Sequence, residues 1–262
     1  MKEEKKPRFK RILLKLSGEA FLGNQNYGID LNYLKVLSTY IKEIHALNVE
    51  TAIVVGGGNI WRGRDAKEIG MEDATADYIG MLATIMNALA LQTVLEGFAL
   101  EVRVQSAIQV QELAEPYIRR RAIRHLEKGR IVIFAGGTGS PFFSTDTTAA
   151  LRAAEIGAEV ILKATNVDAV YSEDPKENSN AIQYKEIDYT EILSKNLKVI
   201  DSTSTSLSRD NQIPFIVFSI KDPSTLVTVL YSKEIGTSVR SLQKEVCKKN
   251  ERTRRFNKWN EK

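Results

Sequence analysis

The feature that most constrains this chain is a regular alternation of short apolar runs with longer helical patterns. Most of the runs are nearly continuous in Val, Ile, Leu and Phe, which favours strands that are covered on both faces of a parallel sheet. The predicted strands are 11–16, 51–55, 101–105, 130–135, 158–164 and 214–218, and the predicted helices are 31–47, 76–96, 117–128, 146–156, 204–211 and 223–230. Right-handed βαβ crossovers then give the α/β class, as a three-layer αβα sandwich around a largely parallel sheet.

The length of 262 residues and the distribution of charge together suggest one central domain with two basic tails. The formal net charge is +4, yet residues 1–10 carry +3 and residues 241–262 carry +5, which leaves −4 for the rest. We therefore expect a basic tail over 1–9, a single domain over 10–240, and a basic, flexible tail over 241–262. Nucleic-acid binding by the folded body is not expected, although a tail could contact RNA, DNA or an acidic surface.

Compartment and membrane association are addressed by three further features. The single cysteine, Cys247, excludes an intrachain disulfide and a cysteine-based metal site, and it favours a reducing cytoplasm. The first ten residues are charged and lack the apolar segment of a signal peptide. The stretch 78–95 has no charged residue, but polar positions interrupt it. We expect it to be a helix buried on most sides, in the core or at a subunit interface, rather than a membrane span.

Three glycine-bearing segments, 15–19, 56–63 and 136–146, follow three of the predicted strands. Such segments offer backbone N–H groups to an anion. The second, "VVGGGNIWRG" at 54–63, matches neither GxGxxG nor the P-loop pattern. It therefore indicates phosphate binding without identifying the type of phosphate-binding site. Because the carboxyl ends of parallel strands meet at one edge of the sheet, we expect the backbone N–H groups of the three segments to line one common anion-binding surface.

Charged side chains lie close to these segments. Lys15 and Lys163 occur at the ends of apolar strands, where an ammonium needs a negative partner. Asp146 has two interpretations, the N-cap of a helix or a carboxylate that holds the two lysines in place. Arg62 could reach a phosphate bidentately, and Asp77, at the start of the uncharged helix, could accept hydrogen bonds from ribose. Two cations over this anion-binding surface favour phosphoryl transfer.

A nucleoside could be bound by the segment 164–175, because Thr165, Tyr171 and Asp174 combine an aromatic ring with polar groups. The two histidines, His45 and His125, lie in or at the ends of predicted helices, and we interpret both as structural. The sequence contains no metal-ligand cluster, so a divalent ion would arrive with the nucleotide.

Five blocks of the sequence, in order and spacing, resemble the bacterial uridylate (UMP) kinases of the amino acid kinase superfamily. These blocks are "KRILLKLSGEAF" (10–21), "VVGGGNIWRG" (54–63), "DYIGMLATIMNALALQ" (77–92), "GTGSPFFSTDT" (137–147) and "LKATNVDAVYSEDP" (162–175). The third and fourth blocks are specific to uridylate kinases, whereas KLSG and GGGN also occur in acetylglutamate, aspartate and carbamate kinases. The resemblance covers roughly residues 9–240.

This resemblance implies transfer of the ATP γ-phosphoryl group to UMP with Mg²⁺, as a step of pyrimidine nucleotide synthesis. The implied catalytic residues are Lys15, Lys163, Asp146 and Arg62. The implied ATP-binding residues are Lys15, Leu16, Ser17, Gly18, Gly58, Arg62, Thr165, Asn166, Tyr171 and Asp174. The implied UMP-binding residues are Gly57, Asp77, Thr138, Gly139, Ser140, Pro141, Phe142, Phe143, Ser144 and Thr145. No protein side chain is implied as a metal ligand.

Regulation and assembly are implied as well. Uridylate kinases commonly form a homohexamer, a trimer of dimers, which would bury the helix 78–95, and they respond to GTP as activator and UTP as inhibitor. The loop similar to the effector-linked region consists of Gly23, Asn24, Gln25, Asn26, Tyr27 and Gly28. Two departures stand out: Asn166 replaces a lysine that many members have, and a basic tail of about twenty residues extends past the usual terminus.

Two alternatives to a UMP kinase stay open at this point. A related kinase acting on a carboxylate or carbamate would share the fold and the lysines but should lack a block such as 138–145. A uridylate-responsive nucleic-acid-binding regulator would use the basic tails instead. Detectable phosphoryl transfer to UMP separates the first hypothesis from both.

Overall fold

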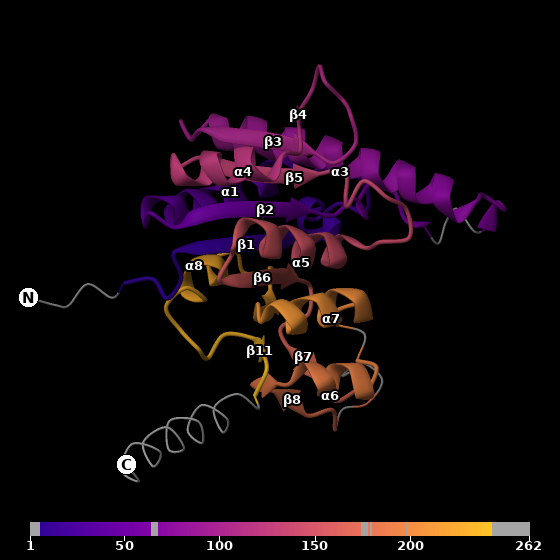
Figure 1. Ribbon diagram of the computed structural model, residues 1–262, viewed down its shortest axis with the longest axis vertical. Helices are drawn as coiled ribbons and strands as arrows, with labels where there is room; N and C mark the ends of the chain where they lie inside the picture. The colour runs from indigo at the N-terminus through magenta and orange to yellow at the C-terminus, as the bar shows by residue number, and fades with distance from the viewer. Residues whose placement is uncertain (1–5, 64–67, 174–177, 179, 198, 243–262) are drawn as a thin grey trace, which may run out of the picture.

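Parallel strands form the middle of the molecule (Figure 1). The computed structural model describes residues 6–63, 68–173, 178, 180–197 and 199–242. Within that part of the chain, nine strands pair in the order β4-β3-β5-β2-β1-β6-β10-β11-β9. They are β1 Arg11–Leu16, β2 Glu50–Val55, β3 Val102–Ser106, β4 Glu115–Pro116, β5 Ile131–Ala135, β6 Val160–Thr165, β9 Glu186–Ile187, β10 Phe215–Ser219 and β11 Thr237–Val239. Only the β10–β11 pair of this sheet is antiparallel, so the predicted parallel sheet is confirmed.

The strands that the sequence did not predict are all short and lie at the margins. β4 and β9 have two residues each and β11 has three. A separate two-stranded sheet joins β7, Val170–Tyr171, to β8, Gln183–Tyr184, antiparallel. Such elements are too brief to carry a periodic pattern, and tertiary contacts determine them. The predicted surface loop 172–180 connects β7 and β8, and only part of it lies within the described residues.

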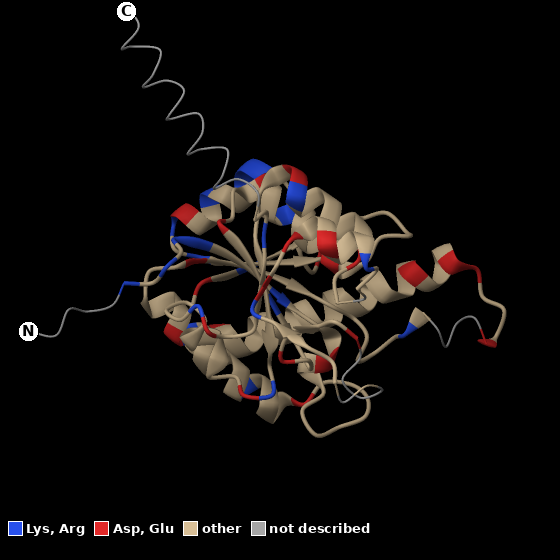
Figure 2. Cartoon of the chain, turned by 90° about the horizontal axis from the view of Figure 1, so that it is seen from below, with Lys and Arg blue, Asp and Glu red and all other residues tan. Residues whose placement is uncertain are grey.

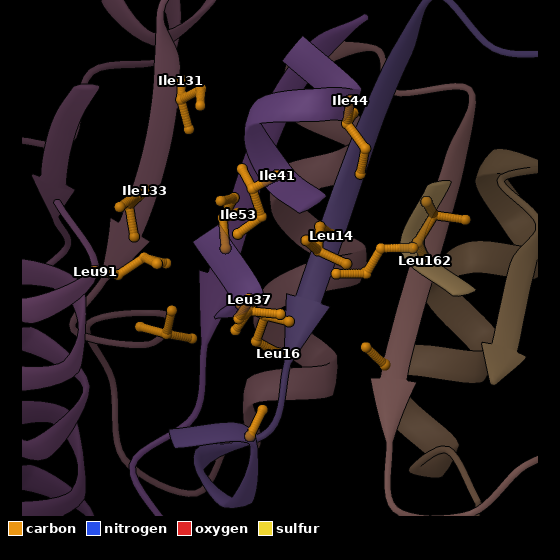
Figure 3. Close-up of a cluster of buried hydrophobic side chains, with 14 of the residues drawn as sticks. Leu14, Leu16, Leu37, Ile41, Ile44, Ile53, Leu91, Ile131, Ile133 and Leu162 are labelled. Atoms are coloured by element: carbon orange, nitrogen blue, oxygen red, sulfur yellow. The ribbon is translucent and has the colours of Figure 1, made fainter. Parts of the chain in front are cut away.

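Helices cover both faces of the sheet, which confirms the three-layer prediction (Figures 1 and 2). They are α1 Leu31–Ala46, α3 Asp73–Glu96, α4 Arg119–Glu127, α5 Thr145–Ile156, α6 Tyr189–Ser194, α7 Ser202–Asn211 and α8 Thr225–Thr228, with a 3₁₀ turn η1 at Gly18–Phe21. Strand side chains alternate between two apolar clusters, one beneath α1, α3 and α8 and the other beneath α4, α5, α6 and α7. Figure 3 shows part of the first cluster, in which Leu37 and Ile41 of α1 pack onto Leu14 and Ile53.

The uncharged segment of the sequence lies in α3, the longest helix described, and within this chain only its inner face is buried. α3 begins at Asp73, and its first turns project beyond the sheet (Figures 1 and 2). By length and composition this helix could cross a membrane, yet its inner face joins the core that covers β3 and β5. Its outer face exposes Tyr78, Leu82 and Met86 by 47%, 50% and 55%. This spacing of four residues forms one apolar stripe, so α3 is not buried on most sides within one chain, and its burial at a subunit interface stays a prediction.

Candidate active site

The two predicted lysines are neighbours because of strand register. β1 and β6 pair in parallel with Lys15 opposite Lys163. Both side chains point to the α5 side of the sheet, since Leu13 and Ile161, two residues earlier on each strand, belong to the cluster on that side. Each lysine is 7% exposed. Two nearly buried ammonium groups therefore lie side by side at the carboxyl edge, where a negative group between them is required.

Asp146 is that negative group. Its Oδ1 lies 2.8 Å from Lys15 Nζ, and its Oδ2 accepts a hydrogen bond from Lys163 Nζ. Lys163 also donates to the carbonyl of Val199. The alternative role as the N-cap of α5 was wrong, because Ser144 occupies that position and its Oγ accepts from the backbone N–H groups of Asp146 and Thr147. Asp146 lies in the first helical turn, where a carboxylate also interacts favourably with the helix dipole.

Electrostatics keep the carboxylate of Asp146 ionised. Burial alone would raise its pKa, but the charges of Lys15 and Lys163 and their hydrogen bonds more than offset this and lower the pKa to about 2. Burial lowers the pKa of Lys163, and Asp146 restores part of that loss. At neutral pH Asp146 is thus an anion that holds both lysine side chains, and it is too weak a base to accept a proton. The cluster can bind and neutralise an anion that enters from the carboxyl edge.

The glycine segments after β1 and β2 are in direct contact. A Cβ on Gly18 would lie 2.4 Å from the backbone nitrogen of Gly58, and one on Gly56 would lie 2.7 Å from the nitrogen of Gly18. Such distances exclude any side chain at either position. The glycines therefore let two backbone segments approach each other beside Lys15. Gly57 is equally confined on its other side, because its Cβ would lie 2.8 Å from the carbonyl oxygen of Gly80 in α3.

Arg62 lies beside these glycines and is not fully engaged by the protein. Its Nε donates to the carbonyl of Gly58 at 3.0 Å, and one terminal nitrogen is 3.8 Å from Glu19. Glu19 in turn accepts a hydrogen bond from Asn166 at 2.5 Å. The structure thus brings Arg62 and Asn166 together through one exposed carboxylate, and an arriving phosphate would compete with that carboxylate for Arg62.

The predicted nucleoside-binding residues lie near the end of β6. Thr165 is the last residue of this strand, and Tyr171 lies in β7, where its hydroxyl donates to the carboxylate of Asp168 at 3.0 Å and 3.1 Å. Burial raises the pKa of Tyr171, and the contact with Asp168 raises it further. Asp174 lies outside the described residues. Thr165 lies two residues after Lys163 on the same strand, and the contact of Thr165 and Tyr171 with a base stays a prediction.

The predicted acceptor loop, 138–145, runs from β5 to the start of α5 and is held by Asp77. The carboxylate of Asp77 accepts a hydrogen bond from the backbone N–H of Phe142 at 2.7 Å. Phe142 has φ +69°, a strained conformation for a residue with a side chain, and it is 74% exposed. The expectation that Asp77 opens its helix was wrong, since α3 begins at Asp73 and Asp77 is in the second turn. This placement is what lets Asp77 reach the loop.

The predicted effector loop, 23–28, contacts the second glycine segment. Gly28 N donates to the carbonyl of Asn59 at 3.0 Å, and Asn59 Nδ2 donates to the carbonyl of Gly28 at 2.9 Å. Gly23 and Gly28 have φ of +53° and +87°, which glycine tolerates. A cavity of about 250 Å³ lies between this loop and the ends of β6 and β10, and its lining includes Gly23, Asn24, Gln25 and Asn166. An effector role for the loop stays a prediction.

Sequence reasoning missed two sets of residues that hold the site together. Asn59 and Asn87 are 2% and 0% exposed and exchange reciprocal side-chain hydrogen bonds of 2.9 Å and 2.7 Å. Asn87 also donates to the carbonyl of Gly56, so α3 fixes the glycine segment. Asp201, the N-cap of α7, accepts hydrogen bonds from Ser144 and Thr147 of α5. Two features of the sequence could have indicated these residues. Asn87 is an amide within an apolar helix, and Asp201 precedes "STST", a pattern typical of a helix N-cap.

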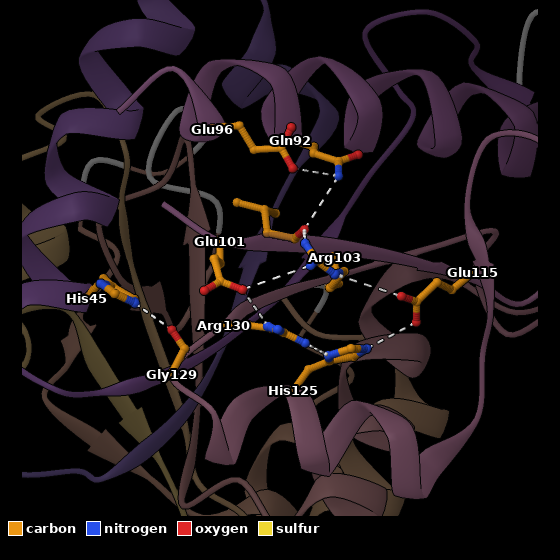
Figure 4. A network of polar contacts seen from close by, with 10 residues as sticks. His45, Gln92, Glu96, Glu101, Arg103, Glu115, His125, Gly129 and Arg130 are labelled. Carbon is orange, nitrogen blue, oxygen red and sulfur yellow. Dashed lines mark hydrogen bonds and ion pairs between the residues drawn. The ribbon is translucent and has the colours of Figure 1, made fainter. Parts of the chain in front are cut away.

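Both histidines lie outside the site, in contacts within the fold (Figure 4). His45 Nε2 is 2.6 Å from the carbonyl of Gly129. His125 lies between Glu115 and Arg130, at 3.1 Å and 3.2 Å, in a polar network on the β3–β4 side of the sheet. These contacts support the structural interpretation. Among the described residues, no group of three or more His, Cys, Asp or Glu side chains could hold a metal ion.

Comparison with known proteins decides the family. A profile of the amino acid kinase family matches residues 10–219. The chain belongs to the amino acid kinase family. This kinase has 39% sequence identity to the UMP kinase from Bacillus anthracis, with a TM-score of 0.86 over 89% of this chain and 97% of the other. It has 38% identity to the UMP kinase from Ureaplasma parvum, with a TM-score of 0.84 over 89% and 100% of the two chains.

A more distant structure has the same fold. The uridylate kinase from Archaeoglobus fulgidus shares 29% identity with this amino acid kinase, with a TM-score of 0.68 over 87% of this chain and 99% of the other. In all three comparisons the match extends over nearly the whole of the known structure. The resemblance inferred from the five sequence blocks is thereby confirmed, as is the identity of the chain as a phosphotransferase.

Proposed function

We propose that this amino acid kinase is a UMP kinase, which transfers the ATP γ-phosphoryl group to UMP and yields UDP and ADP. The observation that carries the proposal is the cluster of Lys15, Asp146 and Lys163 at the carboxyl edge, between the glycine segments and the loop 138–145. The three similar structures are UMP or uridylate kinases, which supports UMP as the acceptor. The same proposal places the reaction in pyrimidine nucleotide synthesis and the protein in the cytoplasm.

The geometry suggests how the transfer proceeds. Catalysis of phosphoryl transfer is mainly positioning and neutralisation of charge spread over oxygens, because the protein has little covalent chemistry to perform. Lys15 and Lys163 would contact the transferred group from one side, with Asp146 keeping both ammonium groups oriented. Arg62 would bind donor phosphate oxygens in exchange for Glu19. The acceptor phosphate is already ionised at neutral pH, so the reaction requires no general base, in agreement with the low pKa of Asp146.

Mg²⁺ fits this site only as a partner of the nucleotide. Asp146 is the carboxylate at the cluster, and both of its oxygens are engaged by ammonium groups. Since no cluster of metal-ligating side chains occurs among the described residues, ATP phosphates and water would be its ligands. When bound, the ion would neutralise charge on the donor phosphates.

Assembly and regulation form the finer part of the proposal. The apolar stripe of Tyr78, Leu82 and Met86 supports a subunit interface along α3, because exposed contiguous apolar surface usually marks an interaction site. We include a homohexamer, activation by GTP and inhibition by UTP in the proposal. The hydrogen bonds from Gly28 and Asn59 connect the effector loop to the glycine segment, which gives an effector a route to the ATP site.

The decisive experiment measures ADP release with Mg-ATP and a panel of acceptors: UMP, CMP, dUMP, AMP, acetylglutamate and carbamate. We expect UMP to give the highest kcat/KM. Preference for acetylglutamate or carbamate would overturn the proposal in favour of a related carboxylate or carbamate kinase. Absence of transfer to every acceptor would favour the regulator hypothesis, whose basic C-terminal tail, 241–262, lies mostly outside the described residues.

A further inference from the structure

The hydroxyl of Ser144 is fully occupied by the protein. Its Oγ accepts from the backbone N–H groups of Asp146 and Thr147 at 3.0 Å and 3.1 Å, and it donates to Asp201 Oδ2 at 2.6 Å. A serine hydroxyl has one hydrogen to donate and two lone pairs to accept with. All three are used here. Ser144 therefore has nothing left to offer a nucleotide unless one of these hydrogen bonds breaks, although it lies in the loop expected to bind UMP.

Asp201 connects the starts of two helices. It is the N-cap of α7, where its Oδ1 accepts from the backbone N–H of Ser204 at 2.8 Å and from the hydroxyl of Thr147 at 3.0 Å. Its other oxygen accepts from Ser144. A third contact runs back across the same junction, because Ser204 Oγ donates to the carbonyl of Asp146 at 2.9 Å. The first turn of α5 is thus fixed by three hydrogen bonds to the start of α7.

That first turn carries Asp146, whose carboxylate separates Lys15 from Lys163. The segment before α7 contributes as well, since Val199, two residues before Asp201, accepts a hydrogen bond from Lys163. Asp201 also places a second negative charge near Lys163, which raises the pKa of that lysine. A misplacement of about 1 Å in such a cluster can reduce turnover on the order of 100-fold. The Ser144–Asp201 contact is therefore in a position to control catalysis without touching a substrate.

We propose that Ser144 and Asp201 are a pair of positioning residues that hold the lysine–aspartate cluster, and that Ser144 is not a ligand of UMP. The proposal rests on the proposed phosphoryl transfer and adds to it two residues that act through Asp146 and Lys163. It departs from the role that the family resemblance implies for Ser144.

Steady-state kinetics of Ser144→Ala, Asp201→Asn and the double variant test the pair. Each single variant should lower kcat by about 10-fold or more and leave KM for UMP within about twofold, because the lost contacts are made to the protein. The double variant should be little worse than the poorer single variant, because both substitutions break the same contact. A rise in KM for UMP with unchanged kcat in Ser144→Ala would overturn the proposal, since that is the signature of a lost substrate contact.

Three comparisons separate positioning from loss of folding. Asp188→Asn is the matched control: Asp188 caps the neighbouring helix α6 through the N–H of Thr190 at 2.7 Å, and it should retain the kinetics of the unchanged chain. Asn also accepts hydrogen bonds at an N-cap, so Asp201→Asn should fold. Ser144→Thr keeps the hydroxyl and should recover most of the kcat lost in Ser144→Ala. Both variants should unfold at the same temperature as the unchanged chain. If kcat of Ser144→Thr were then as low as that of Ser144→Ala, the hydroxyl would not be the positioning group.

The pH profile adds a readout that a purely structural role would not change. The charged groups that face Lys163 are Lys15, Asp146 and Asp201. Removing the charge of Asp201 should lower the pKa of Lys163, so Asp201→Asn should lose activity at a lower alkaline pH than the unchanged chain. Ser144→Ala, which keeps that charge, should not. An identical alkaline limb in Asp201→Asn and the unchanged chain would refute the electrostatic half of the proposal.

Failure of the proposed UMP kinase function can be distinguished from failure of the Ser144–Asp201 proposal. If the unchanged chain transfers no phosphoryl group to UMP, the proposed function fails, whereas the pair can still be tested by NMR titration of lysine-labelled protein. We expect the Lys163 signal to titrate at lower pH in Asp201→Asn than in Asp188→Asn. Equal titration in the two variants would refute the effect of Asp201 on Lys163, the electrostatic half of the proposal, regardless of the substrate.

Discussion

Asp146→Asn is the substitution for which the structure makes the sharpest prediction. Asn keeps the size of the side chain and removes the one negative charge between the ammonium groups of two lysines that are each 7% exposed. The lysines then repel each other in a site with little water, and their pKa values should fall. A lysine that has lost its proton no longer neutralises a phosphoryl group. We therefore expect kcat to fall on the order of 100-fold or more at pH 8.

The effect on stability can be worked out from the pKa of Asp146. Folding lowers this pKa from 3.8 to about 2. A change of one in pKa corresponds to about 1.36 kcal/mol, so the ionised carboxylate contributes roughly 2–3 kcal/mol to the free energy of unfolding at neutral pH. Removing one partner of a buried pair typically costs about 3–5 kcal/mol. We expect Asp146→Asn to lower the free energy of unfolding at pH 7 by roughly 2–4 kcal/mol.

The sign of the pH dependence differs between the two proteins. In the unchanged chain the contribution of Asp146 is present above pH 3.8 and is lost as the pH falls through about 2. The Asn variant lacks this term. In the Asn variant the two lysines should instead have a lowered pKa in the folded state. Their protonated forms then destabilise the folded protein at low and neutral pH. This destabilisation decreases as the pH rises above the folded pKa and disappears above the unfolded pKa. The stability deficit of Asp146→Asn should therefore shrink at alkaline pH.

Urea unfolding at pH 7 and pH 9.5, together with ADP release at pH 8, measures both effects. Asp188→Asn serves as the control, because it neutralises a helix-capping carboxylate away from the lysines. Equal unfolding free energies for the Asp146→Asn variant and the unchanged chain at pH 7 would refute the electrostatic reasoning. A deficit that stays constant up to pH 9.5 would show that packing, rather than repulsion between Lys15 and Lys163, causes the loss.

Three other predictions concern the glycine segment, the α3 stripe and the metal. Gly57→Ala places a Cβ 2.8 Å from the Gly80 carbonyl oxygen, so the glycine segment must shift. The kinetic assay should then show a fall in kcat/KM for UMP of about 100-fold. Gly63→Ala is the control, because a Cβ at Gly63 would have no atom within 4 Å. If α3 forms the proposed subunit interface, Leu82→Glu should lower the sedimentation coefficient in analytical ultracentrifugation, and a coefficient equal to that of the unchanged chain would contradict this interface. EDTA should abolish ADP release without changing the free energy of unfolding, since the described residues offer no metal cluster; a fall in that free energy would indicate a protein-bound ion.

The central architecture could be read from the sequence because parallel strands covered on both faces must be apolar along their whole length. All six predicted strands occur with ends displaced by no more than two residues, and the six predicted helices occur as well. The identity of the lysines followed from the same rule. An ammonium at the end of a run such as 11–16 violates the apolar pattern, and a local violation indicates a function.

Helix starts were harder to predict, because several residues near a start can cap it. Asp146 and Ser144 are both suitable N-caps, and only the structure shows that Ser144 takes the role and leaves Asp146 free to reach the lysines. In the same way, α3 begins four residues before Asp77, which turns that side chain from a helix opener into a partner of Phe142. Local preference alone cannot distinguish such options.

By itself, the sequence determined the alternation of strands and helices, the chemical groups of the site and the family, because each of these is written in residue types at fixed spacing. Tertiary structure decided what those groups do to one another. Register between β1 and β6 places Lys15 opposite Lys163, and the junction of α5 with α7 places Asp146 between them. Asp201, about 55 positions along the chain from Asp146, joins the site only through this junction. Contacts between distant segments leave no periodic trace in a sequence, so the positioning of the site becomes visible only in the folded chain.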